Sequence, residues 1–327
     1  MESGRMNEVL YLSYADVEKA GMSMAEVVEA VEAGFIEKGN GRAEVPPKPG
    51  IHTQPDAFIH AMPAYIPSMG VAGMKWVSGY PENYRLGLPY ITGLLILNDL
   101  ETGVPICVMD CMWITAMRTA AASAVAAKYL ANPTSTRMAI LGAGVQGRSN
   151  LEALALVMNG LQTVKVYDVR RDVLDRYVED ARGKYPFEVV PVASPEAAVR
   201  DSDIIITAGP ILKHPDPAIE ASWLKPGALG IPLDFDSYWK DDALQEPEHF
   251  FTDDIEQLDY YRTVGFFRGA PRAEGDMGDV VTGRVGRASP DERIVCMNLG
   301  LAIEDMATAI VIYKKAVKAG LGRKIPL

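Results

Sequence analysis

A short glycine-rich stretch constrains the fold of this chain more than any other feature. Residues 141–147 read LGAGVQG and lie between the apolar run RMAI and a segment with apolar residues at helical spacing. Gly142, Gly144 and Gly147 thus form the pattern G-x-G-x-x-G where a strand is predicted to turn into a helix. Such a turn brings backbone N–H groups and the positive end of a helix close to a bound phosphate.

A second strand pattern follows this helix and ends in an acid. The run TVKVYD ends at Asp168, about 20 residues past the glycines, where a Rossmann unit has the carboxylate that binds the ribose of NAD. Arg170 and Arg171 follow and would suit the 2′-phosphate of NADP, but an acid at the strand end repels that phosphate. We therefore predict a dinucleotide site that prefers NAD to NADP. The alternative is a structural turn followed by an unrelated surface acid.

Strand and helix patterns alternate from residue 137 to about residue 233. After the first two strands come the runs FEVVPV, DIIITA and GALGIPLD, and helical patterns lie between the earlier ones. DIIITA is almost continuously apolar, as expected for a strand that is buried on both faces. This alternation predicts a parallel sheet covered by helices, which makes the region a Rossmann-type α/β domain.

Before residue 115 the pattern is different. Residues 22–41 predict an amphipathic helix, and the runs AGMKWVSGY, YITGLLILND and VPICVMD predict a mainly antiparallel sheet. Residues 115–131 (TAMRTAAASAVAAKYLA) predict a helix of small residues that leads into the nucleotide domain. Residues 300–320 predict a last helix, which either returns to the first domain or helps to form a dimer.

Composition and charge exclude several classes of protein. The 327 residues are enough for two domains, and the formal net charge of −11 argues against a nucleic-acid partner. We expect no membrane span, because the apolar runs are short, and no secretory signal at the N-terminus. The three cysteines lack C-x-x-C spacing and the four histidines are scattered. These features predict a cytoplasmic protein without a metal site.

Two basic residues outside the predicted nucleotide domain are candidates for binding a carboxylate. Lys75 lies in a predicted strand that is followed by a loop rich in Gly and Pro. Arg118 lies in the first turn of the predicted small-residue helix, where a guanidinium can hold a carboxylate through two hydrogen bonds. The alternative for Arg118 is an ordinary position on the surface.

Taken together, these motifs resemble the ornithine cyclodeaminase/mu-crystallin family, and the resemblance spans nearly the whole chain. The archaeal alanine dehydrogenases of this family are especially similar, down to PPK (46–48) ahead of AMPA. The blocks that carry the resemblance are AMPAYI, GMKWV, GYPEN, TGVPICVMD, TAMRTAAASAVAAKYLA, LGAGVQG and GLAIED.

The resemblance implies a fold and a class of reaction. Family members are usually homodimers in which a Rossmann domain accompanies an α+β substrate-binding and dimerisation domain built from both chain ends. For this chain it implies an NAD-binding domain over residues 119–303 and a substrate and dimerisation domain over 1–118 with 304–327. The substrates of the family are amino acids or imines, and the cofactor is NAD or NADP.

The resemblance also implies roles for particular residues. Lys75 and Arg118 match the binders of the substrate carboxylate, and Lys48 falls where the alanine dehydrogenases have Lys. Asp236 matches the acid that handles the substrate amine, where a carboxylate stabilises an iminium or accepts a proton. Lys75 is a second candidate for proton transfer, since buried amines shift their pKa readily. The predicted cofactor-binding residues are Gly142, Gly144, Val145, Gln146, Gly147, Asp168, Thr119, Thr207 and Ala208.

The chain departs from the family pattern around the predicted substrate site. His60 stands where cyclodeaminases have Glu and alanine dehydrogenases have Arg, and Tyr90 lies in a loop where Thr is expected. We include both in the predicted substrate site. The segment around Asp236 reads PLDFDSYWKDD, so Asp234 is an additional acid. If this segment is a strand, both carboxylates point the same way; alternatively, Asp234 faces solvent and Asp236 acts alone.

The same segment carries bulky aromatic residues, which either narrow the substrate pocket or stack on a larger substrate. These residues are Phe235, Tyr238 and Trp239.

Three functions are compatible with the sequence. The first is an NAD-dependent oxidoreductase that transfers a hydride between the nicotinamide and the α-carbon of a small amino acid or imine, as alanine dehydrogenases and ketimine reductases do. The second is a cyclodeaminase, which releases ammonia and uses bound NAD without net redox change; His60 in place of Glu counts against it. The third is a ligand-binding protein like mu-crystallin. Beyond these stands a Rossmann protein unrelated to the family.

Overall fold

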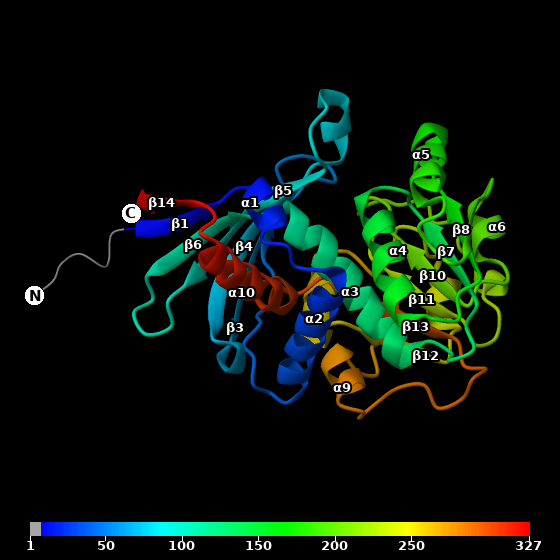
Figure 1. The fold of residues 1–327 in the computed structure, drawn as a ribbon. Helices are drawn as coiled ribbons and strands as arrows, with labels where there is room; N and C mark the ends of the chain where they lie inside the picture. Colours follow the sequence, from blue (N-terminus) through cyan, green and yellow to red (C-terminus); the bar gives the residue numbers. More distant parts are fainter. Residues whose placement is uncertain (1–7) are drawn as a thin grey trace, which may run out of the picture. The chain divides into compact units, whose positions relative to one another are not determined.

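The structure, a computed structural model, describes residues 8–327. The chain divides into two compact units, which we call the first and the second unit. The first unit comprises Met1–Arg118 and Leu301–Leu327, and the second comprises Thr119–Gly300. The chain passes from the first to the second within helix α3 (Met112–Leu130) and returns at Gly300 (Figure 1).

The first unit contains a seven-stranded sheet. Its strands are β1 (Glu8–Leu12), β2 (Gly50–Ile51), β3 (Phe58–Ile66), β4 (Val71–Gly79), β5 (Ile91–Asn98), β6 (Pro105–Asp110) and β14 (Arg323–Pro326). They lie in the order β14-β1-β6-β5-β4-β3-β2, and all neighbours are antiparallel except β1 and β6. The predicted mainly antiparallel sheet is therefore confirmed.

Helices cover one face of this sheet. They are α1 (Tyr14–Lys19), α2 (Met24–Gly39) and α10 (Ala302–Ala319), and short 3-10 turns occupy Pro67–Met69 and Pro81–Leu86. Helix α10 packs on β3, β4 and β5 and also on α2. Gly73 of β4 allows this close approach, since a Cβ there would lie 3.0 Å from the Met306 sulfur. Gly34 of α2 also faces α10, but less tightly, because its Cβ would lie 3.6 Å from that of Ala307.

The second unit contains a seven-stranded sheet in which all neighbours are parallel. Its strands are β7 (Arg137–Leu141), β8 (Thr163–Tyr167), β9 (Glu188–Pro191), β10 (Ile204–Thr207), β11 (Leu229–Pro232), β12 (His249–Thr252) and β13 (Ile294–Met297). Its helices, besides α3, are α4 (Val145–Val157), α5 (Arg171–Ala181), α6 (Pro195–Val199), α7 (Asp241–Gln245), α8 (Ile255–Thr263) and α9 (Met277–Val281), with a 3-10 turn at Ala221–Trp223. The predicted Rossmann-type sheet is therefore confirmed.

The strand order fixes where this unit can bind a ligand. The order β12-β13-β11-β10-β7-β8-β9 shows that the chain builds outward from β7 on one side and then continues with β10 on the other. Ligands of open parallel sheets bind outside the carboxyl ends of the strands at such a switch point. The glycine loop follows β7 directly, so it lies at this switch point.

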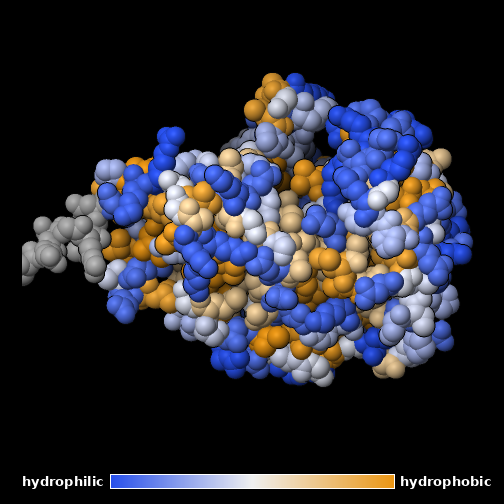
Figure 2. Space-filling model, in the orientation of Figure 1, coloured by the Kyte–Doolittle hydropathy of each residue, from blue (hydrophilic) through white to orange (hydrophobic). Residues whose placement is uncertain are grey.

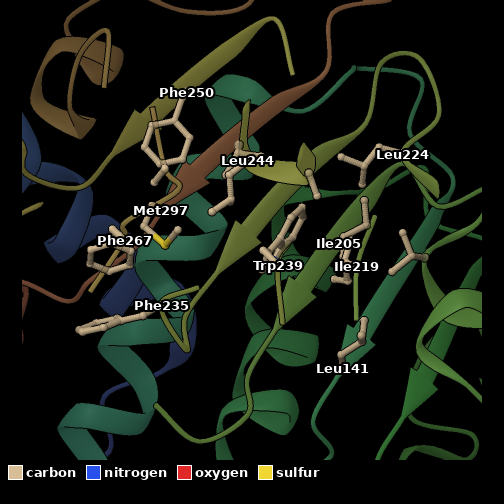
Figure 3. Close-up of a cluster of buried hydrophobic side chains, with 14 of the residues drawn as sticks. Leu141, Ile205, Ile219, Leu224, Phe235, Trp239, Leu244, Phe250, Phe267 and Met297 are labelled. Carbon is tan, nitrogen blue, oxygen red and sulfur yellow. The ribbon is translucent and has the colours of Figure 1, made fainter. Parts of the chain in front are cut away.

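The aromatic residues beside Asp236 belong to the core of this unit. Trp239 and Phe235 are each 1% exposed and pack among side chains from β10, β12 and β13 (Figure 3). Gly230 makes room for the indole, because a Cβ at this position would lie 2.4 Å from the Trp239 ring. The sequence-based alternatives were that these side chains narrow the substrate pocket or stack on a substrate. Because both side chains are buried in the core, neither alternative holds for Phe235 or Trp239. Their bulk fills the interior instead, while Tyr238 is half-buried.

Candidate functional site

The glycine loop has the shape that a dinucleotide requires. Gly142 has φ 109°, a conformation that favours glycine, and a Cβ there would lie 2.5 Å from the Ala208 carbonyl oxygen. A Cβ on Gly147 would lie 2.0 Å from the Gly142 carbonyl oxygen, so only glycine lets α4 pack this close to the loop. A Cβ on Gly144, by contrast, would meet nothing within 4 Å. These three glycines together form a backbone cradle at the start of a helix.

The other predicted cofactor-binding residues near this loop differ in burial and in their contacts. Val145, the first residue of α4, is 66% exposed. Gln146 is half-buried beside it. Asp168 follows β8, and its carboxylate accepts hydrogen bonds from the N–H groups of Ala143 and Arg170, both at 2.8 Å. Asp168 thus ties the loop to the end of β8 and keeps further acceptor positions for a hydroxyl group.

In the first unit, Lys75 and Arg118 lie together in a buried charged cluster. Lys75 of β4 is fully buried, and its Nζ donates to Asp305 Oδ1 at 2.7 Å and to Thr115 Oγ1 at 3.4 Å. Arg118 donates from Nη1 to Glu304 Oε2 at 2.6 Å, and its Nε lies 3.1 Å from Asp305 Oδ1. One carboxylate oxygen of Asp305 is therefore shared by both cations.

Burial and charge set the protonation of this cluster. Burial lowers the pKa of Lys75, and the nearby Arg118 guanidinium adds to this effect, whereas Asp305 opposes it. Burial raises the pKa of Glu304, although the Arg118 guanidinium favours its ionised form. The two acids thus stabilise the charged forms of the two bases, and removal of one member would leave a buried charge uncompensated.

Arg118 occupies a different place on its helix than the sequence suggested. Helix α3 begins at Met112, because Asp110 Oδ1 accepts a hydrogen bond from the Met112 N–H at 2.8 Å and so caps the helix. Arg118 therefore lies in the second turn and not in the first. Helices α3 and α10 together place Arg118 opposite Glu304. The N-terminus of α3 does not contribute to this placement. Arg118 is also 6% exposed, which excludes an ordinary surface arginine.

Lys48 and His60 lie beside this cluster. His60 is two residues along β3 from Met62, the cross-strand partner of Lys75, so both side chains belong to the same buried face of the sheet. Burial, followed by the charges of Lys48, His52 and Lys75, lowers the pKa of His60 to about 2. Its imidazole is therefore neutral, and it stacks on Phe58 with 4.3 Å between the ring centroids.

Tyr90 is the predicted substrate-binding residue that the structure does not bring to this cluster. It lies at the base of the hairpin between β4 and β5, where its carbonyl accepts from the Tyr80 N–H at 2.9 Å. The next residue, Ile91, pairs with Gly79, which lies four residues from Lys75 along β4. At strand spacing this is about 14 Å from Lys75.

The predicted catalytic acid Asp236 lies in a turn after β11. It is half-buried, and its Oδ2 accepts a hydrogen bond from the Phe267 N–H at 3.0 Å. Burial raises its pKa, and Asp241 acts in the same direction, whereas the Phe267 N–H and Arg268 oppose this shift. One oxygen of this carboxylate therefore binds the backbone of the segment that follows α8.

Asp234 lies in the same turn but has another environment. Strand β11 ends at Pro232, so Asp234 and Asp236 do not project together from a strand, and Asp234 does not face solvent either. It is fully buried and accepts hydrogen bonds from Thr207 Oγ1 at 2.6 Å and from the Gly209 N–H at 2.7 Å. Both predicted orientations of Asp234 are therefore wrong, whereas the action of Asp236 alone, which belonged to the second alternative, stays a prediction.

The remaining predicted cofactor residues, Thr119, Thr207 and Ala208, all belong to the second unit. Thr119, in the middle of α3, and Ala208, directly after β10, are half-buried. Thr207 is fully buried and its hydroxyl donates to Asp234, which gives this side chain an indirect role.

Sequence reasoning missed Glu304 and Asp305 as site residues. Both are fully buried, and both lie in the first turn of α10 within the block GLAIED. Two adjacent acids at the start of an otherwise apolar helix are the signal that would have found them, because buried carboxylates need cationic partners. Their partners are Arg118 and Lys75.

Two absences concern residues 8–327. Within this part of the chain, no helix combines the length and the apolar character needed to cross a bilayer. In the same range, no three His, Cys, Asp or Glu side chains come together in a way that would hold a metal ion.

Comparisons with known proteins match this geometry to a family. Residues 7–320 match the model of the ornithine cyclodeaminase/mu-crystallin family. The nodulation efficiency protein NfeD of Rhizobium meliloti is 39% identical over 317 residues, which are 96% of this chain and 97% of that protein.

Solved structures agree with this match. The Thermococcus litoralis Δ1-pyrroline-2-carboxylate reductase, in complex with NADH and L-proline, is 32% identical with a TM-score of 0.87, covering 97% of this chain and 100% of that one. An archaeal alanine dehydrogenase dimer with bound NAD is 33% identical with a TM-score of 0.85, covering 97% and 99% of the two chains. This chain therefore belongs to the ornithine cyclodeaminase/mu-crystallin family.

Proposed function

We propose that this enzyme is an NAD-dependent oxidoreductase that transfers a hydride between the nicotinamide and the α-carbon of a small amino acid or the corresponding imine. The observation that carries the proposal is the buried pair Lys75 and Arg118, which share one oxygen of Asp305 in the first unit. The glycine cradle of the second unit supports the cofactor, since Gly142 and Gly147 have no room for a Cβ. The relatives that bind NAD or NADH support the same reading.

The charged cluster suits the carboxylate of an amino or imino acid. Arg118 presents a planar guanidinium and Lys75 a compact ammonium, and both are held in place before a substrate arrives. Among the described residues no donor reaches Asp305 Oδ2, although this oxygen is buried. An N–H of the substrate amine would satisfy it. An α-amino acid requires cations that bind its carboxylate and an acceptor that binds its amine. Lys75 and Arg118 supply the cations, and Asp305 Oδ2 supplies the acceptor.

We assign the proton transfer to Asp236. NAD, when bound, supplies the acceptor for the hydride that leaves the α-carbon. The amine of the substrate must lose a proton as the imine forms, and a carboxylate with a raised pKa can accept it. In the reverse direction the same group returns the proton. Asp168 supports NAD rather than NADP, because its carboxylate at the end of β8 repels a 2′-phosphate.

The environment of His60 favours a dehydrogenase or imine reductase over a cyclodeaminase. A cyclodeaminase acts on a diamino acid, whose distal amine needs an acceptor or an acid nearby. His60 is neutral, and the charges around it come from Lys48, His52 and Lys75, all of which would repel a second ammonium group. Of the two acids of the cluster, Glu304 already binds Arg118, and Asp305 binds both Lys75 and Arg118.

We also propose that the chain forms a homodimer through the open face of the first sheet. On this face Trp76 and Leu94 are directly opposite each other and are 44% and 43% exposed. Tyr65 is exposed on the same face, and Met74 and Ile96 are half-buried. An apolar face of this size on one side of a sheet marks an interface. The tip of the β4–β5 hairpin is also hydrophobic (Figure 2).

The dimer has its own test. Trp76→Glu would place a charge in the proposed interface and should convert the protein to a monomer in sedimentation velocity. Lys184→Glu, at an exposed position after α5 in the second unit, is the control and should leave the mass unchanged. A monomeric wild-type protein at micromolar concentration would contradict this assignment.

The three cysteines bear on the compartment. Cys107, Cys111 and Cys296 are all buried and free. We propose a cytoplasmic location on this basis, because thiols persist in a reducing compartment. Fractionation of the source cells with an antibody against the chain would test it.

The proposed reaction is tested by following absorbance at the NADH band with NAD and a panel of amino acids, while ammonia is assayed in the same wells. NADH and ammonia that rise together support the proposal and identify the substrate. Ammonia without NADH would mean cyclodeamination, and neither signal, with NADH still bound, would mean a binding protein.

Variants then assign the roles. Arg118→Lys keeps the charge but loses the planar fork, so KM for the amino acid should rise about tenfold or more. Asp236→Asn should lower kcat at unchanged KM. Arg85→Ala, far from the cluster along the hairpin, should change neither constant. An Asp236→Asn enzyme with wild-type kcat would refute the role of Asp236.

A further inference from the structure

Asp234 holds together two segments that are far apart in the sequence. Its Oδ1 accepts from the hydroxyl of Thr207, the last residue of β10, and its Oδ2 accepts from the Gly209 N–H. The loop formed by residues 207–209 is therefore fastened at both ends by one carboxylate. Because Asp234 is fully buried, water cannot replace either hydrogen bond.

The direction of each hydrogen bond is fixed. The Gly209 N–H can only donate, and Trp239 Nε1 donates to Thr207 Oγ1 at 3.0 Å. The Thr207 hydroxyl accepts from the indole and must therefore give its own proton to Asp234. Both oxygens of Asp234 act as acceptors, which suits a carboxylate and does not suit an amide. Burial raises the pKa of Asp234 to about 7 and the charge of Asp236 adds to this effect, whereas the donors from Thr207 and Gly209 favour the ionised form.

The fastened loop lies against the glycine cradle. The Ala208 N–H donates to the Leu141 carbonyl at 2.8 Å, and a Cβ on Gly142 would lie 2.5 Å from the Ala208 carbonyl oxygen. On its other side, Gly209 is covered by Tyr238, since a Cβ on Gly209 would lie 2.8 Å from the Tyr238 ring. If this loop shifted, Ala208 would therefore press on Gly142, the first glycine of the cradle.

We propose that Asp234 is a positioning residue for the cofactor site, which fixes residues 207–209 against Gly142 and thereby sets the affinity for NAD(H). Asp234 does not touch the cofactor itself, because it is fully buried within the second unit. The inference rests on the proposed NAD-dependent function. It explains why an acid stands two residues before Asp236, at a position that carries no reaction chemistry.

Direct titration of NADH into the purified protein, followed by nicotinamide fluorescence, tests this proposal without any amino acid. Asp234→Asn places an amide N–H₂ against one of the two donors, so the Kd for NADH should rise about tenfold. Thr207→Val keeps the shape of the side chain but removes the hydroxyl, and it should weaken NADH binding to a similar extent. Thr207→Ser restores the hydroxyl and should return the Kd to within about twofold of wild type.

Asp203 offers a matched control at the opposite end of the same strand. Its carboxylate accepts from the N–H groups of Thr136 and Arg137, both at 2.8 Å, just before β10 begins. Asp203→Ala therefore removes both hydrogen bonds, together with the ion pair between Asp203 and Lys225, at the end of the strand away from the glycine loop. It should lower the melting temperature and leave the Kd for NADH within about twofold of wild type.

The outcomes separate this inference from the proposed function. If wild-type protein does not bind NADH, the proposed function fails. If wild type binds NADH and Asp234→Asn binds it equally well, the proposed function survives and the role of Asp234 is refuted. The role is also refuted if Thr207→Ser is as impaired as Thr207→Val, or if Asp203→Ala weakens binding as much as Asp234→Asn. Once a substrate is known, KM for NAD should rise in Asp234→Asn while KM for the substrate stays unchanged.

Discussion

Replacing His60 with glutamine should make the folded chain less sensitive to acid. His60 is 6% exposed, its ring stacks on Phe58, and burial together with Lys48, His52 and Lys75 lowers its pKa to about 2. In an unfolded chain the same imidazole has a pKa of about 6.5. Unfolding therefore allows His60 to take up a proton at any pH between these two values.

The sign and size of the effect follow from this difference in pKa. A base with a lowered pKa in the folded state lets the unfolded state bind more protons, so the free energy of unfolding falls as the pH falls below 6.5. Each pH unit in this window costs about 1.4 kcal/mol. Between pH 8 and pH 5 the loss amounts to about 2 kcal/mol, and any folded-state pKa below about 4 gives the same result.

Thermal unfolding of wild type and His60→Gln at pH 8, 6.5 and 5 measures this contribution. One kcal/mol shifts the melting temperature of a domain of this size by about 2–4 °C, so the variant should gain about 4–8 °C relative to wild type between pH 8 and pH 5. His214→Gln, at an exposed position of the second unit, should track wild type at every pH. A constant difference between wild type and His60→Gln across this range would refute a buried neutral imidazole.

Three further predictions concern other sites. Burial and the Arg118 guanidinium lower the pKa of Lys75, and the Asp305 carboxylate counteracts them. Asp305→Asn removes this carboxylate, so the alkaline limit of kcat/KM should move to lower pH. An unmoved limit would contradict the pairing of Lys75 with Asp305. Gly147→Ala places a Cβ 2.0 Å from the Gly142 carbonyl oxygen, so it should destabilise the second unit by about 1–3 kcal/mol in denaturant titrations. The same variant should bind NADH more weakly. Wild-type stability together with wild-type NADH affinity would exclude the close packing. Burial lowers the pKa of His249, but contacts with Glu274 and Glu292 outweigh this and raise it. This stabilisation is present below about pH 6.5 and lost as the pH rises, so His249→Gln should lower the melting temperature most at pH 6 and hardly at pH 9; an equal loss at both would contradict it.

Local patterns predicted most of the second unit. The runs RMAIL and DIIITA and the helix between residues 145 and 159 coincide with β7, β10 and α4, because strand and helix periods are properties of neighbouring residues. The predicted start of α3, at residue 115, was less accurate, because the helix begins at Met112. Asp110 caps this helix through the Met112 N–H, and a cap depends on one residue rather than on a period.

The charged cluster could be predicted only in part. Lys75 and Arg118 were recognised from their surroundings and from the family resemblance, but their acidic partners were not. Glu304 is 186 residues from Arg118 along the chain, and Asp305 is 230 residues from Lys75. No periodic pattern connects positions so far apart, and only the packing of α10 on β4 brings them together.

The orientation of Asp234 could not be predicted from the sequence either, although its partners are closer along the chain. Spacing alone left two orientations for this side chain, toward Asp236 or toward solvent. The structure turns it inward, because β11 ends at Pro232 and Phe235 adopts φ 60°, a left-handed conformation that is costly for a large side chain. Burial of the Phe235 ring against Tyr261, Phe266 and Phe267 offsets this cost. Hydrophobic packing therefore determines where the acid points.

The balance of charge in the first unit bears on how an anionic substrate is bound. Lys75 and Arg118 carry two positive charges, and Glu304 and Asp305 supply two negative ones, so the buried quartet is neutral within a chain of net charge −11. A carboxylate therefore gains little from long-range attraction. Its affinity must come from hydrogen bonds at fixed geometry, in which the planar guanidinium and the ammonium are already oriented by the two acids. Such preorganisation gives selectivity for the shape of the carboxylate over its charge, which is why we expect the two acids to matter for the reaction as much as the two bases.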